Sequence, residues 1–181
     1  KKASFHRDFI RDSTILKILG FYPLEAFLLN RTISYPKIIN FLVTLRCNLR
    51  CDICHTADAL TTSKKGELSL DEIYQFVEDC AHFGPDWHFS GGEPFARLDL
   101  PQILDRIQNL GMRSSVVSNG LLIHDKLLDQ LSPGSLSSIT FSVLGVREDH
   151  DREVKKPGAY DSLRANIKKL HLALPETAIY V

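Results

Sequence analysis

The chain has 181 residues, of which 44 % are hydrophobic and 24 % are charged. This composition suits one globular domain with a substantial core. Lys+Arg and Asp+Glu each number 22, so the basic excess that is typical of a nucleic-acid-binding protein is missing. No apolar run reaches the about 18 residues that a membrane span needs. We therefore expect neither a nucleic-acid partner nor a membrane span.

Residues 1–36 are predicted to form an irregular lead-in with short helices at 14–19 and 23–29. The chain starts at Lys1, without an initiator Met or a signal-peptide pattern, so we expect it to be trimmed at its start. The main domain is predicted to cover residues 37–181.

Within the main domain, apolar stretches of strand length alternate with segments of helical spacing. Predicted strands cover residues 38–43, 87–89, 114–118, 139–143 and 177–181, and predicted helices cover 70–80, 100–110, 124–131 and 160–174. Ser69 followed by Glu72 forms a capping box for the first helix. Asp99 is the expected N-cap of the second, with Gly111 as its stop.

Strand and helix in alternation predict parallel strands joined by crossover helices. The fold class is therefore α/β, either as an open sheet or as a partial (β/α) barrel with an N-terminal helical extension. Because the chain ends inside the last predicted strand, we expect truncation after about the fifth strand. In both architectures, ligands bind at the carboxyl ends of the strands.

Three of the four cysteines lie within eight residues directly after the first predicted strand, as Cys47, Cys51 and Cys54. This clustering indicates a metal site in a reducing compartment, the cytoplasm, rather than a disulfide scaffold. Thiolates favour zinc, cuprous copper and iron–sulfur clusters. Three of them would hold three irons of a cubane cluster and leave the fourth iron open. Cys80, on the inward face of a predicted helix, is expected to pack in the core.

Two other interpretations of the cysteines are open. Positions 47, 51 and 54 would share one face of a helix as a buried stripe, although polar residues surround them. Alternatively, His55 would be the fourth ligand of a zinc site, although no second cysteine pair is present. The corresponding function is a non-catalytic zinc or iron–sulfur module that acts as a sensor or scaffold.

The C-x3-C-x2-C spacing after a strand resembles the signature of the radical S-adenosylmethionine (radical SAM) superfamily. The resemblance implies that Cys47, Cys51 and Cys54 ligate a [4Fe–4S] cluster, with Ile53 near the adenine of S-adenosylmethionine. It also implies reductive cleavage of S-adenosylmethionine to methionine and a 5′-deoxyadenosyl radical, which abstracts hydrogen from a substrate. A flavodoxin or ferredoxin would supply the electron.

A second motif, Ser90-Gly91-Gly92-Glu93-Pro94, follows the second predicted strand. Glycines permit a close backbone approach, and a carboxylate accepts hydrogen bonds from a cationic amine. The motif is similar to the family's GGEP motif, which implies that Gly91, Gly92 and Glu93 contact the amino group of the methionine moiety.

The third and fourth strands also end in polar residues. Ser118 and Asn119 resemble a family motif that contacts the ribose or methionine part, although Asn-Gly is also an ordinary turn. Ser142 lies at the end of the fourth predicted strand, and the resemblance makes it a further expected contact of S-adenosylmethionine. Arg152 is the expected basic partner of its carboxylate.

The segment 141–160 is similar to peptide-modifying members of the family, which carry additional SPASM or twitch domains. Two positions depart from that pattern: Leu144 replaces an Asp, and Val154 replaces an Arg. The substrate is therefore expected to be a peptide or a small metabolite, with any auxiliary cluster lying beyond residue 181. A relative that binds S-adenosylmethionine without a productive substrate is a further alternative.

Overall fold

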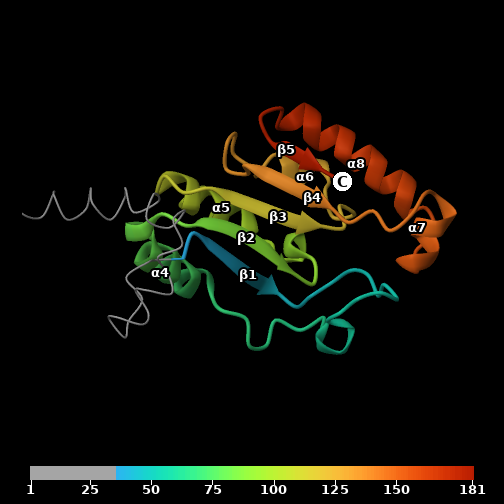
Figure 1. Cartoon of the computed structure of the whole chain (residues 1–181), viewed down its shortest axis with the longest axis horizontal. Coiled ribbons are helices and arrows are strands. Elements are labelled where there is room, and N and C mark those ends of the chain that lie inside the picture. The colour runs from blue at the N-terminus through green and yellow to red at the C-terminus, as the bar shows by residue number, and fades with distance from the viewer. Residues whose placement is uncertain (1–35) are drawn as a thin grey trace, which may run out of the picture. The chain divides into compact units, whose positions relative to one another are not determined.

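A computed structural model of the chain describes residues 36–181. The predicted lead-in and its short helices lie outside the described residues, apart from Pro36. The described chain forms one five-stranded sheet in which every pair of neighbours is parallel and the order is β1-β2-β3-β4-β5 (Figure 1). Sequential order with helical crossovers is the arrangement of a partial (β/α) barrel, so the predicted fold class is confirmed.

The strands are β1 (Ile38–Thr44), β2 (Asp86–Gly91), β3 (Ser114–Ser118), β4 (Ser138–Phe141) and β5 (Ala178–Tyr180). The helices are α4 (Leu70–Cys80), α5 (Leu100–Asn109), α6 (Asp125–Leu128), α7 (Glu148–Glu153) and α8 (Ala159–Ala173). Short 3-10 turns lie at Ala57–Ala59, Ala81–Phe83 and Pro94–Ala96.

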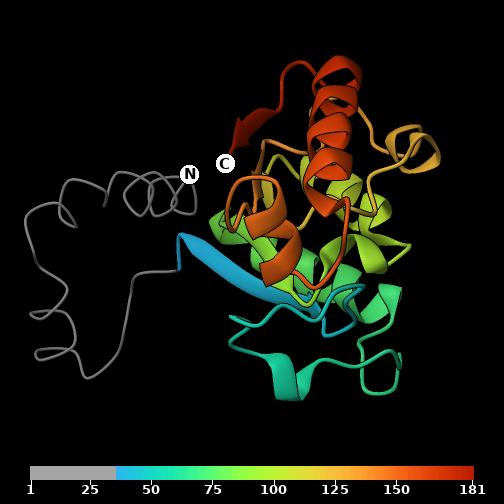
Figure 2. The ribbon, with the colours of Figure 1, turned by 90° about the vertical axis from the view of Figure 1, so that its right-hand side faces the viewer.

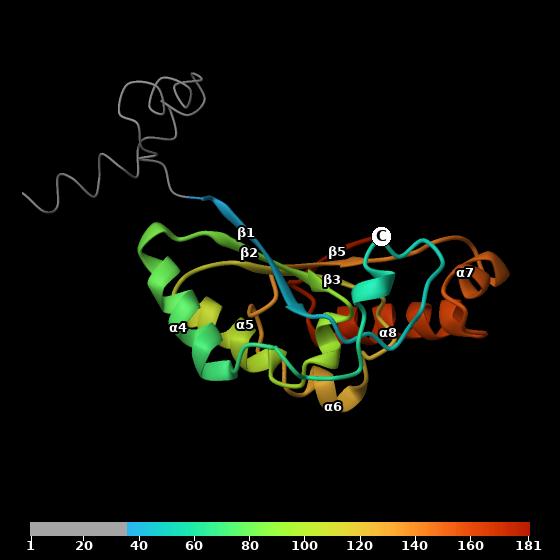
Figure 3. The same cartoon turned by 90° about the horizontal axis from the view of Figure 1, so that it is seen from below.

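The two faces of the sheet have different surroundings. Helices α4, α5, α6 and α8 lie on one face, and within residues 36–181 no α-helix covers the opposite face (Figure 3). Between this face and the helices lie the fully buried side chains of the core, among them Trp87, Phe89 and Ile139 of the sheet and Ile103 and Ile107 of α5. This one-sided cover puts the open face on the inside of the partial barrel.

The helix ends follow the sequence signals with one exception. The Ser69 hydroxyl accepts from the Glu72 N–H at 3.2 Å, and the Glu72 carboxylate accepts from the Ser69 N–H at 2.7 Å, which confirms the capping box. Asp99 occupies the N-cap position of α5 but makes no capping hydrogen bond. Its carboxylate instead pairs with buried Arg97, at 2.8 Å from Nε, because that guanidinium is the stronger donor.

Helix α7 was not predicted from the sequence. Its six residues, Glu-Asp-His-Asp-Arg-Glu, contain no apolar residue, and only His150 is buried. A helix of this kind has no hydrophobic periodicity to reveal it. Within residues 36–181, no helix has the length and apolar character that crossing a membrane requires.

Candidate functional site

The carboxyl ends of β1 to β4 lie at one end of the sheet, which faces the viewer in Figure 2. Most of the predicted site residues lie at or directly after these ends. The cysteine segment follows β1, the glycine motif spans the end of β2, Asn119 follows β3 and Ser142 follows β4. Parallel strands put these segments side by side because all carboxyl ends point the same way.

The three clustered cysteines are half-buried, and none forms a disulfide. Burial raises the pKa of Cys47, although a hydrogen bond from the Leu49 N–H opposes the shift. Burial also raises the pKa of Cys51, and the charges of Cys47 and Cys54 raise it further. Closely spaced thiolates of this kind need cationic partners, as the irons of a cluster would provide. The donor set thus fits an iron–sulfur cluster.

The zinc interpretation predicts a different arrangement of ligands. His55, its expected fourth ligand, is exposed in the loop after Cys54. Within residues 36–181, no three Cys, His, Asp or Glu side chains converge closely enough to hold a single metal ion. The assignment of Cys47, Cys51 and Cys54 as cluster ligands remains a prediction.

An apolar seat supports the cysteine loop. Leu49 packs with Val154 and Ala159, all three at most 5 % exposed, and Cys47, Cys51, Leu121 and Leu144 pack against them. Both departures from the family pattern, Leu144 and Val154, therefore contribute to this seat. The Asp52 N–H also donates to the Glu153 carbonyl at 3.1 Å, which ties the loop to the end of α7.

Gly91 and Gly92 are needed where the glycine motif lies against β1. A Cβ at Gly91 would lie 2.2 Å from the Thr44 carbonyl oxygen, and one at Gly92 would lie 2.4 Å from that of Arg46. The Gly92 N–H donates to Thr44 at 2.9 Å, and the Glu93 N–H donates to the Arg46 carbonyl at 2.8 Å. From the sequence, we expected the two glycines to let the backbone approach a ligand closely. In the structure, the close approach that they permit is to the chain's own backbone at Thr44 and Arg46.

Glu93 is fully buried and joins three segments of the site. Its carboxylate accepts from the Phe95 N–H at 3.1 Å, from the Ser118 hydroxyl at 2.8 Å and from the Asn119 N–H at 2.8 Å. Asn119 in turn donates from Nδ2 to Asn48 in the cysteine loop, at 2.8 Å. Burial raises the pKa of Glu93 to about 7, because these three hydrogen bonds only partly offset desolvation.

The remaining predicted residues are more accessible. Ile53 is 56 % exposed, and Ser142 is half-buried, with its N–H bound to the Ser118 carbonyl at 3.0 Å. Arg152 lies on the surface of α7 and pairs with Asp149 of the same helix at 2.7 Å. The structure thus brings Glu93, Ser118 and Asn119 into hydrogen-bond contact but does not bring Arg152 to them.

Two groups of residues beside the site were missed from the sequence. Arg46 binds Glu67 at 2.8 Å, and the Thr44 hydroxyl also donates to Glu67, which ties the segment before α4 to the end of β1. His150 accepts the Leu144 N–H on Nδ1 at 3.2 Å and so fixes the loop after β4. Apart from the similarity of segment 141–160 to peptide-modifying members of the family, the sequence holds no signal for these contacts.

Residues 41–181 match the Radical SAM superfamily. The chain is 35 % identical over 149 residues to Fe-coproporphyrin III synthase of Methanosarcina barkeri, covering 82 % of this chain and 36 % of that protein. It is 31 % identical over 118 residues to PqqA peptide cyclase of Bradyrhizobium diazoefficiens, covering 65 % and 31 % of the two chains. The chain thus spans about a third of the length of these relatives.

Among solved structures, Streptococcus suis SuiB bound to its precursor peptide SuiA aligns with a TM-score of 0.71 at 15 % identity. The alignment covers 91 % of this chain and 36 % of SuiB. At this identity the likeness supports the fold alone. The family match and the cysteine loop at the carboxyl end of β1 together show that the chain belongs to the radical SAM superfamily, whose enzymes use a [4Fe–4S] cluster and S-adenosylmethionine.

Proposed function

We propose that this chain carries the part of a radical SAM enzyme that cleaves S-adenosylmethionine. The observation that supports this most is the contact between the cysteine loop and the buried Glu93 network through Asn48 and Asn119. When bound, the cluster supplies the electron that splits S-adenosylmethionine into methionine and a 5′-deoxyadenosyl radical, which takes hydrogen from a substrate.

The three cysteines would hold three irons and leave one iron for the amine and carboxylate of S-adenosylmethionine. Glu93 has no open surface, so we assign it a positioning role: it holds Ser118 and Asn119 against the glycine motif. Gly91 and Gly92 let this motif lie against the backbone at the end of β1. Together these residues set the spacing between the cysteine loop and the end of β3.

Ile53, Asn119 and Ser142 have accessible surface and are the proposed contacts of the adenine, the ribose and the methionine part. Arg152 would reach the methionine carboxylate only by releasing Asp149. An exposed pair of this kind contributes little stability, so the exchange would cost little. The buried Val154, which stands where the family pattern has an Arg, provides no positive charge for the methionine carboxylate.

The substrate we propose is a peptide, with a small metabolite as the alternative. PqqA peptide cyclase and the SuiB–SuiA complex are named for peptides, whereas Fe-coproporphyrin III synthase is named for a tetrapyrrole. A flavodoxin or ferredoxin is the proposed electron donor.

Electron paramagnetic resonance on the full-length protein, reconstituted anaerobically with iron and sulfide and then reduced, tests this function. We expect a cluster signal that changes when S-adenosylmethionine is added. Cys47→Ala, Cys51→Ala and Cys54→Ala should each abolish cleavage of S-adenosylmethionine, whereas Cys80→Ala, in the core of α4, should keep the cluster. Stoichiometric zinc without a cluster signal would show that the chain is a structural metal module.

A further inference from the structure

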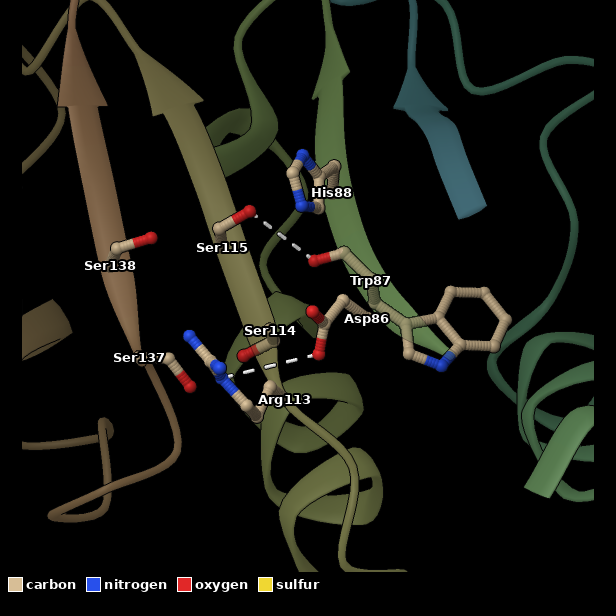
Figure 4. Close-up of a pocket in the computed structure, with 8 residues that line it drawn as sticks. All are labelled: Asp86, Trp87, His88, Arg113, Ser114, Ser115, Ser137 and Ser138. Carbon is tan, nitrogen blue, oxygen red and sulfur yellow. Dashed lines mark hydrogen bonds and ion pairs between the residues drawn. The ribbon is translucent and has the colours of Figure 1, made fainter. Parts of the chain in front are cut away.

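The open face of the sheet carries a row of polar side chains at one level across four strands. Asn40 pairs with His88, His88 pairs with Ser115, and Ser115 pairs with Ser138. Paired residues of parallel strands point to the same face and lie about 4.8 Å apart from strand to strand. Figure 4 shows three of them, His88, Ser115 and Ser138, on the same side of β2, β3 and β4. We call these four residues the polar row.

The polar row has unused hydrogen-bonding capacity. Within the described residues, the side chains of Asn40, His88 and Ser138 make no hydrogen bond or ion pair. The Ser115 hydroxyl makes one long hydrogen bond, 3.4 Å to the Trp87 carbonyl. Asn40 is exposed and the other three are half-buried. Polar groups that the fold leaves unpartnered on an open sheet face are free to bind a ligand.

The face around the polar row is nearly free of charge. Among the residues of the five described strands, Asp86 is the only acidic residue, and Lys and Arg are absent. Asp86 lies at the amino end of β2 with its carboxylate 4.0 Å from Arg113 (Figure 4). A phosphate or polycarboxylate ligand would find no unpaired basic side chain on these strands.

The next level toward the carboxyl ends mixes apolar and hydroxyl side chains. It consists of Leu42, Ser90, Val117, Thr140 and Tyr180. Leu42 is 58 % and Val117 is 44 % exposed, so apolar surface is open beside the polar row. A peptide presents the same combination, because uncharged amide groups alternate with side chains along it.

We propose that the polar row binds an uncharged, amide-bearing segment of a peptide substrate on the open face of the sheet. This inference rests on the proposed function, because that function requires a substrate to lie inside the partial barrel. The carboxyl ends of the same strands carry the cysteine loop and the Glu93 network. A peptide bound to the polar row would therefore lie next to the site where S-adenosylmethionine is cleaved, on the side of the amino ends of the strands.

The probe for this inference is a library of hexapeptides of Gly, Asn, Gln, Val and Leu, blocked by N-acetylation and C-amidation. The reconstituted full-length protein is incubated with the library and S-adenosylmethionine, and retained peptides are quantified by mass spectrometry. We expect retention by the wild type and an about tenfold loss in the double variant His88→Leu, Ser115→Val, because hydrogen bonds are removed. His171→Leu, an exposed histidine on α8, is the matched control and should retain the peptides.

The other results separate the two proposals. Absence of peptide retention by the wild type, equal retention by the double variant, or row-dependent binding of coproporphyrin III would each overturn the inference. Formation of 5′-deoxyadenosine with a chemical reductant is measured in parallel, and its absence in the wild type would overturn the proposed function instead. If circular dichroism shows that the double variant is unfolded, Asn40→Leu and Ser138→Val carry the same test.

Discussion

At the scale of single residues, His150 shows how a buried titratable group shapes the site without belonging to it. It is 1 % exposed, and its Nδ1 accepts a hydrogen bond from the Leu144 N–H, so Nδ1 carries no proton. Burial lowers the pKa of His150 below its ordinary value of about 6.5. Protonation would remove the acceptor and release the loop that carries Ser142.

We predict that His150 makes the stability of the protein fall as the pH decreases through about 6.5. Below that pH the unfolded chain binds a proton at His150 that the folded chain resists, so unfolding is favoured. Urea denaturation of the metal-free protein at several pH values checks this. His150→Gln should flatten the decline, whereas His171→Gln, at an exposed position, should leave it unchanged. Parallel pH curves for the wild type and His150→Gln would contradict the assignment.

Still at residue scale, Gly91 and Gly92 are predicted to tolerate no side chain. Alanine at Gly91 would place Cβ against the Thr44 carbonyl at the end of β1, and alanine at Gly92 would place it against the Arg46 carbonyl just after β1; Gly91 has φ 125° in addition. We expect Gly91→Ala and Gly92→Ala each to lower the free energy of unfolding by about 3 kcal/mol or more. Gly66→Ala is the control, since Gly66 has φ 85° but open space around it. Its cost should stay near the about 1–2 kcal/mol of a left-handed residue, and equal losses at all three glycines would argue against the close contact.

At the scale of elements, the seat of the cysteine loop depends on packing between segments far apart in the sequence. Val154, at the end of α7, packs in one cluster with Leu49, which lies about 100 residues earlier in the chain. We predict that Val154→Ala costs about 1–3 kcal/mol of stability. It should also speed alkylation of Cys47 and Cys51 in the metal-free protein, because both pack against this seat. Val146→Ala, at a 64 % exposed position, should change neither quantity.

The same contrast between local and distant contacts explains what the sequence predicted. The five strands and the capping box of α4 depend on neighbouring residues, and each was predicted within a few positions. The order of motifs also placed the cysteine and glycine segments at one end of the sheet. Helix α7 was missed because its polar sequence shows no apolar spacing.

Contacts between distant side chains were beyond the sequence. Asn48 and Asn119 are 71 positions apart, and an asparagine in a sequence does not indicate which distant side chain it will bind. The enclosure of Glu93 follows from three segments that meet around it, so its positioning role was hidden. The same holds for Asp99, whose carboxylate pairs with Arg97 instead of making the expected capping hydrogen bond.

At the scale of the whole molecule, the two ends of the sheet carry different turns. Turns at the carboxyl ends carry the cysteine loop, the glycine motif, Asn119 and Ser142. Turns at the amino ends carry Gly84, Gly111 and Gly134, and they connect helices back to strands. Helices α4, α5, α6 and α8 all lie on the same face of the sheet and so do not distinguish its two ends (Figure 3). A ligand at the proposed site should therefore affect one set of turns and leave the other unchanged.

Amide hydrogen exchange on the reconstituted full-length protein, with and without S-adenosylmethionine, distinguishes the two ends. We expect slower exchange in segments 45–56, 91–97, 119–124 and 142–147, because a bound ligand restrains the turns that contact it. Segments 84–86, 111–113 and 134–137, at the amino ends, should exchange at unchanged rates and serve as the internal control. Uniform slowing would instead indicate that binding raises global stability without a local site. Slowing confined to the amino ends would place S-adenosylmethionine at the wrong end of the sheet for the cysteine loop to act on it.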